Sequence, residues 1–166
     1  MRKLLSIVLI FTCLSGTTHA SEPILERLTL NNDNSFDSVT RSYLPNQSFE
    51  GTLINTGGWG SESNAMIWFS LEDLPTKNVV IENVSLSVYM QEITNPQWKR
   101  EGGVTIGMAT EYWDESVTWT TQPNRVNVSE TYFLPDIGRV SYDITEYYKK
   151  WISDESENFG IRIRPN

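Results

Sequence analysis

The sequence predicts an all-β protein, a jelly-roll β-sandwich with one short helix near its C-terminus. Two observations carry this prediction. Short segments of alternating apolar and polar residues recur along the chain, and Gly, Pro, Asn and Ser separate them. A helical pattern of apolar residues occurs only once, near the C-terminus. Several short strands with turn residues between them are typical of sandwiches and jelly rolls.

The first twenty residues have the pattern of a secretory signal peptide. Arg2 and Lys3 precede an apolar run from Leu4 to Leu14, and small residues near Ala20 mark a cleavage site. The run is shorter than the ~20 residues that a membrane-spanning helix needs. We therefore expect residues 1–20 to be removed and residues 21–166 to form one domain. The mature chain is expected to be extracellular or periplasmic, without insertion into a membrane.

Cleavage near Ala20 would change the chemical inventory of the chain. Cys13 and His19 are the only Cys and the only His, and both would leave with the signal peptide. The mature chain would keep 11 basic residues against 21 acidic ones, a net charge of −10 that disfavours nucleic acid as a partner. Serine triads, cysteine nucleophiles and H-E-x-x-H zinc sites all need His or Cys. We therefore expect a protein that is not an enzyme, with a carboxylate pair for glycoside hydrolysis as the alternative.

The strands are predicted from alternation. In the clearest one, Val84 to Gln91, every second residue is aliphatic or Met, which is typical of a half-buried strand. Ala65 to Leu71 is an almost continuous apolar strand. The other candidates cover residues 104–108, 140–144 and 159–164, with weaker ones at 24–30 and 53–54.

One helix is predicted near the C-terminus. Apolar residues there fall at i, i+3, i+4, i+7 and i+8, namely Ile144, Tyr147, Tyr148, Trp151 and Ile152. Asp143 and Glu146 resemble a capping box, and Lys149 and Lys150 suit the C-terminal end of the helix dipole. The pattern predicts a two-turn helix that docks over one end of the sandwich.

Two stretches resemble a known family. Residues 113–119, W-D-E-S-V-T-W, followed by Gln122-Pro123, are similar to the W-x-E…V-T-W…P signature of the DNRLRE domain. The ending, residues 140–145, then Trp151, then residues 158–161, resembles that of the same family, and the resemblance extends over about residues 50–166. It implies a jelly-roll β-sandwich of secreted bacterial and archaeal proteins. Some members are classed as carbohydrate-binding module family 96, associated with alginate.

Aromatic residues outside the predicted core indicate a polysaccharide ligand, because sugar rings stack on aromatic rings. Trp113, Trp119 and Trp151 are assigned to the core, since they lie in the family signature and on the helix stripe. Trp68 points to the opposite side of its strand from Ile67. The predicted stacking residues are Trp68 and two loop residues, Trp59 and Trp98, with core packing as the alternative.

Four basic residues are expected to bind the carboxylates of an acidic polysaccharide such as alginate. Arg162 and Arg164 alternate with isoleucines, so they share one face of a sheet, and Lys99 and Arg100 are adjacent in a loop. An arginine can bind a carboxylate through two parallel hydrogen bonds. The alternative is an ordinary solvated face on which these residues pair with nearby Glu or Asp.

Calcium is the one cofactor that the sequence predicts. Asn31, Asp33 and Asp37 lie in an eight-residue segment rich in oxygen ligands, although its spacing differs from that of an EF-hand. Clusters of Asn, Asp and Ser are also typical of turns, which is the alternative reading of this segment.

These observations lead to three hypotheses on function. The first is a secreted carbohydrate-binding module for an acidic polysaccharide. The second is a non-catalytic structural or adhesive β-sandwich of the cell surface or extracellular matrix. The third is a small polysaccharide lyase that uses Tyr and Arg.

Overall fold

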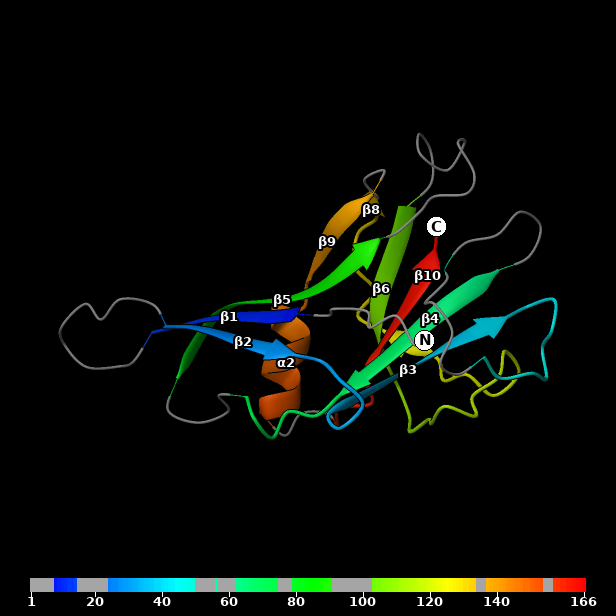
Figure 1. Cartoon of the computed structure of the whole chain (residues 1–166), viewed down its shortest axis with the longest axis horizontal. Helices are drawn as coiled ribbons and strands as arrows, with labels where there is room; N and C mark the ends of the chain where they lie inside the picture. The colour runs from blue at the N-terminus through cyan, green and yellow to red at the C-terminus, as the bar shows by residue number, and fades with distance from the viewer. Residues whose placement is uncertain are drawn as a thin grey trace.

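The computed structural model describes residues 8–14, 24–49, 56, 62–74, 79–90, 103–133, 137–153 and 157–166. Over these residues the protein is mostly β, with antiparallel sheets and one short helix (Figure 1). The predicted β class and the single helix near the C-terminus are therefore confirmed for this part of the chain. No helix among the described residues is long and apolar enough to cross a membrane.

The smaller sheet has four antiparallel strands. Their order is β2 (Ile24–Thr29), β1 (Val8–Leu14), β5 (Val80–Met90) and β9 (Gly138–Asp143). Strand β1 belongs to the segment that the sequence assigns to a signal peptide. It pairs with β2 on one side and β5 on the other, so that Leu9 lies opposite both Leu28 and Leu86. Strand β1 therefore fills an inner position of this sheet.

The larger sheet has six strands and carries most of the residues discussed below. The order is β3 (Ser35–Arg41), β4 (Ser63–Phe69), β10 (Ile161–Pro165), β6 (Gly103–Ala109) and β7 (Arg125–Val126), and β8 (Tyr132–Phe133) also pairs with β6. The C-terminal strand β10, red in Figure 1, thus lies between β4 and β6. Its side chains lie among residues that are distant in the sequence.

The main core combines residues of both sheets with the helix. Its largest fully buried members include Ile67, Phe69, Leu86, Ile106, Tyr148 and Ile161. The predicted alternation in the apolar strand is confirmed, because Ala65, Ile67 and Phe69 lie in this core while Met66 lies in a different cluster. Each such aliphatic or aromatic side chain contributes ~1.5–3 kcal/mol of transfer free energy on burial.

Helix α2 (Thr145–Ile152) lies where the apolar stripe predicts it, with Tyr147, Tyr148 and Trp151 buried. Its N-terminus differs from the prediction. The N-cap is Ile144, and Glu146 pairs with Lys149 at 3.1 Å, so the predicted capping box of Asp143 and Glu146 is wrong.

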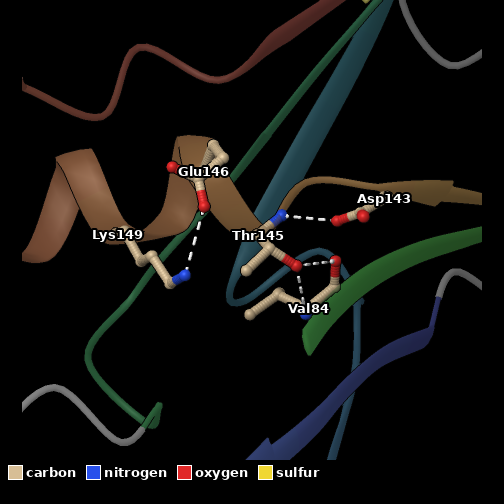
Figure 2. A network of polar contacts seen from close by, with 5 residues as sticks. All are labelled: Val84, Asp143, Thr145, Glu146 and Lys149. Carbon is tan, nitrogen blue, oxygen red and sulfur yellow. Dashed lines mark hydrogen bonds and ion pairs between the residues drawn. The ribbon is translucent and has the colours of Figure 1, made fainter. Parts of the chain in front are cut away.

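The start of the helix is held by two other contacts, which Figure 2 shows. The Asp143 carboxylate accepts a hydrogen bond from the Thr145 N–H at 2.9 Å. The Thr145 hydroxyl accepts one from the Val84 N–H at 2.8 Å, which ties the helix to β5. Both side chains thus satisfy backbone donors that would otherwise lack a partner.

A second apolar cluster lies on the opposite face of the larger sheet. It consists of Met66, Ala109, Trp113 and Val117, with Phe36, Trp68 and Phe159 packed against it. Trp113 and Val117 come from the long connection between β6 and β7. Residues 110–124 therefore cover part of this face, and the larger sheet is buried on both sides at this cluster.

Candidate functional site

The candidate site lies on the face of the larger sheet that points away from the main core. Ile161 and Ile163 are buried in the core, so Arg162 and Arg164 of β10 face the other way, as alternation predicts. The strand register places Arg162 between Met66 of β4 and Gly107 of β6.

A third arginine, Arg125 of β7, joins this pair, and we call Arg125, Arg162 and Arg164 the arginine cluster. Gly107 makes room for it, because a Cβ at that position would lie 3.2 Å from both Cβ and Cδ of Arg125. The stem of Arg125 therefore lies against β6, and its Nη1 donates to the Thr105 carbonyl at 3.0 Å. The three guanidinium groups are close enough to influence one another electrostatically.

Arg162 is the most buried member of the cluster, with 9% of its surface exposed. Its Nη1 donates to the Pro123 carbonyl at 2.9 Å, whereas its Nε is buried without a hydrogen-bond partner among the described residues. Burial, and to a lesser extent the positive charges of Arg125 and Arg164, lower the pKa of Arg162 to about 10. Burial, followed by Arg164, also lowers the pKa of Arg125.

Arg164 already holds a carboxylate. Its Nε donates to Glu62 Oε2 at 3.0 Å and its Nη2 to Glu62 Oε1 at 2.9 Å, which is the paired geometry expected of an arginine fork. Both side chains are half-exposed, at 42% and 39%. Among the described residues, Glu62 is the one carboxylate whose negative charge offsets the positive charge of the cluster.

Trp68 faces away from the main core, and it packs against the second apolar cluster. It stacks on Phe36 with ring centroids 5.0 Å apart, and its Nε1 donates to the Asn158 carbonyl at 3.0 Å. A half-buried ring in this position is a packing residue, so the core-packing alternative describes it better than a free stacking platform. The other predicted site residues, Trp59, Trp98, Lys99 and Arg100, lie outside the described residues.

The three tryptophans assigned to the core have different outcomes. Trp113 and Trp151 are buried, as predicted, at 5% and 6% exposure. The indole N–H of Trp113 donates to the Phe159 carbonyl at 2.7 Å. Trp119 is only half-buried and belongs to neither apolar cluster that the described residues form, so its assignment to the core is wrong.

The segment proposed for calcium uses its side-chain oxygens in a turn. Asn31 Oδ1 accepts from the Asp33 N–H and Asn34 Oδ1 from the Asn31 N–H, both at 2.8 Å. Asp37 lies further on, within β3 and opposite Ile67. Among the described residues, no three His, Cys, Asp or Glu are grouped in a way that would hold a metal ion. These hydrogen bonds favour the turn alternative.

A groove of about 500 Å³ lies beside α2. Its lining residues are Asn127, Val128, Ser129, Tyr132, Asp143, Glu146, Tyr147 and Lys150. The Tyr147 hydroxyl donates to the Asn127 carbonyl at 2.6 Å, and burial raises the pKa of Tyr147 to about 12. The hydroxyl therefore stays protonated at neutral pH. Asp143 and Glu146 give this groove an acidic edge, so it fits an anionic polymer less well than the arginine cluster does.

Sequence reasoning missed two residues of the site, Arg125 and Glu62. Arg125 lies in a two-residue strand that is too short to show alternation. Glu62 precedes β4 and pairs with a residue 102 positions away. No local signal identifies either one.

Comparison with models of known protein families finds no match, and comparison with curated proteins finds none either.

Proposed function

We propose that this protein is a secreted, non-catalytic carbohydrate-binding module, a DNRLRE-like jelly-roll β-sandwich that binds an acidic polysaccharide such as alginate. The observation that carries the proposal is the arginine cluster. Three guanidinium groups lie together on one face of the larger sheet, and among the described residues only one carboxylate, that of Glu62, offsets their charge. The chain as a whole has a net charge of −8. Such a concentration of positive charge on an acidic protein favours an anionic ligand.

The energetics of the cluster support the proposal. Partly buried like charges raise one another's free energy, and an unpaired buried charge is costly. A carboxylate from a ligand would offset this cost, and its two oxygens match the donors of an arginine fork. Arg125 and Arg164 are accessible enough to touch such a ligand. Arg162 would attract the ligand by its positive charge without touching it, because so little of its surface is exposed.

The test is a titration of the mature protein with alginate at several salt concentrations. We expect binding without turnover that weakens with salt, since the Debye length falls from ~10 Å at 0.1 M to ~3 Å at 1 M. Replacing Arg162 and Arg164 by Ala should flatten this dependence. Because Arg162 is buried, R125Q/R164Q is the safer version of the same experiment.

The matched control is R27Q/R139Q, which removes two exposed arginines of the smaller sheet and changes the net charge equally. Equal loss in both double variants would overturn the site. Absence of binding to alginate and other glycans would favour the structural or adhesive alternative, and release of unsaturated uronate, seen as rising absorbance, would favour a lyase.

A further inference from the structure

In the structure, the carboxylate of Glu62 occupies the hydrogen-bond donors of Arg164. Glu62 presents to Arg164 the same two oxygens that a uronate would present. Its backbone is held independently of Arg164, because the Glu62 N–H donates to Ser42 Oγ at 2.7 Å and the Ser42 N–H to the Glu62 carbonyl at 2.9 Å. The contacts with Ser42 therefore position the Glu62 carboxylate beside the guanidinium of Arg164.

We propose that Glu62 is an internal competitor for the carboxylate-binding fork of Arg164. It closes the fork when no ligand is bound, and a carboxylate of the acidic polysaccharide displaces it. This inference rests on the proposed function and adds the residue that lowers the affinity of the site for its ligand.

The exchange is physically feasible for two reasons. The Glu62–Arg164 pair is half-exposed, so water screens it, and opening it costs less than breaking a buried ion pair would. The exchange also conserves charge, since one carboxylate leaves the arginine cluster as another arrives. Arg125 and Arg162 stay beside Arg164 throughout, and their positive charge disfavours an empty fork.

The inference predicts that weakening the competitor strengthens binding. Glu62→Gln should bind alginate about two- to fivefold more tightly than the wild type, the factor that corresponds to an exposed ion pair. Glu62→Asp keeps the charge but shortens the side chain, so it should give a smaller gain. Melting temperatures of both variants establish that they are folded.

The matched control is Glu146→Gln, which removes the same charge from another exposed ion pair, Glu146–Lys149 on α2. We expect this variant to bind alginate as the wild type does, apart from the small effect of net charge. A gain in E62Q that E146Q equals would mean that net charge alone is responsible, which overturns the inference.

The two proposals fail in distinguishable ways. If the wild type binds alginate and R125Q/R164Q does not, but E62Q and E62D show no gain, the competitor is disproved and the proposed function stands. If the folded wild type and E62Q both fail to bind alginate, both proposals fall. A gain seen with a sulfated polymer such as dextran sulfate and not with alginate would mean that no uronate carboxylate displaces Glu62, which overturns the inference.

Discussion

Gly160 sets the point at which the strand with Arg162 and Arg164 begins. It has φ +80°, a left-handed conformation that favours glycine. A Cβ at this position would overlap the carbonyl oxygen of Ile67 and lie 3.0 Å from Trp68 Cα. The preceding Asn158 holds the turn, because its Oδ1 accepts from the Gly160 N–H at 2.9 Å and its Nδ2 donates to the Phe69 carbonyl at 2.7 Å.

Gly160→Ala should therefore destabilise the protein by more than about 1 kcal/mol, because the conformational strain and the steric overlap add. The control is Gly138→Ala. Gly138 also has positive φ, at +130°, but a Cβ there meets no atom within 4 Å. Urea unfolding of both variants measures the difference. Equal losses would show that strain alone matters and that β4 yields at Gly160.

A second prediction at this scale concerns Asp37, whose pKa burial raises above the ordinary value of 3.8, with a further contribution from Glu115. A raised pKa in the folded state favours folding when the group is protonated. This contribution is present below pH 3.8 and is lost as the pH rises through the folded-state pKa. Asp37→Asn should therefore melt higher than the wild type at pH 7, and the gap should close towards pH 3.

The control for that experiment is Asp73→Asn, which removes an exposed carboxylate from a turn after β4. We expect its melting temperature to follow the wild type across the same pH range. A gap for Asp37→Asn that persists unchanged at pH 3 would mean that the carboxylate is not the cause.

At the scale of elements, the connection between β6 and β7 has two roles. Trp113 and Val117 bury one part of the outer face, while Gln122 Oε1 accepts hydrogen bonds from Thr40 at 2.6 Å and Asn64 at 3.1 Å. The Pro123 carbonyl accepts from Arg162. The connection thus covers the apolar part of this face and orients the most buried arginine of the cluster.

The turn between β2 and β3 contains Asn31 and Asp33, two of the residues that the sequence predicts as calcium ligands. Since Asn31 and Asn34 use their side-chain oxygens on backbone N–H groups, we expect no calcium-dependent stability from this element. Melting temperatures in calcium and in chelator should then be equal. A higher melting temperature in calcium would indicate a site that binds the native state, by mass action.

At the scale of the whole molecule, strand β1 contributes to the smaller sheet although the sequence predicts that residues 1–20 are removed. The apolar run that marks a signal peptide also suits an inner strand, and β1 lies between β2 and β5. Removing residues 1–20 would take this strand away. Val84 directs its N–H and C=O toward Thr145 and Ile144, so by alternation the backbone groups of Ser85 and Ser87 face β1.

We therefore expect the amides of Ser85 and Ser87 to exchange hydrogen faster in the protein of residues 21–166 than in the full chain. The amide of Leu86, which faces β9, is the internal control and should keep its protection. Hydrogen exchange followed by NMR separates these positions. Equal protection of all three in the shorter protein would mean that another strand, such as β2, has taken the place of β1.

The sequence by itself determined the local features of this protein. Alternation located β4 and β5, and the stripe that includes Tyr148 and Trp151 located α2, because periodicity depends on neighbours within a few residues. Alternation also assigned Arg162 and Arg164 to one face of their strand. The cap of α2 was misplaced by one residue, since the choice depends on contacts with Asp143 and Val84.

Only the tertiary structure decided what surrounds those residues. A strand pattern says on which side a residue lies, but not which strand is its neighbour or which connection covers it. The position of Arg125 beside Arg162 depends on the order β10, β6, β7 and on the missing side chain at Gly107. Trp68 stacks on Phe36 and packs against the cluster that contains Trp113, and Glu62 reaches Arg164, because chain segments far apart in sequence meet across one sheet.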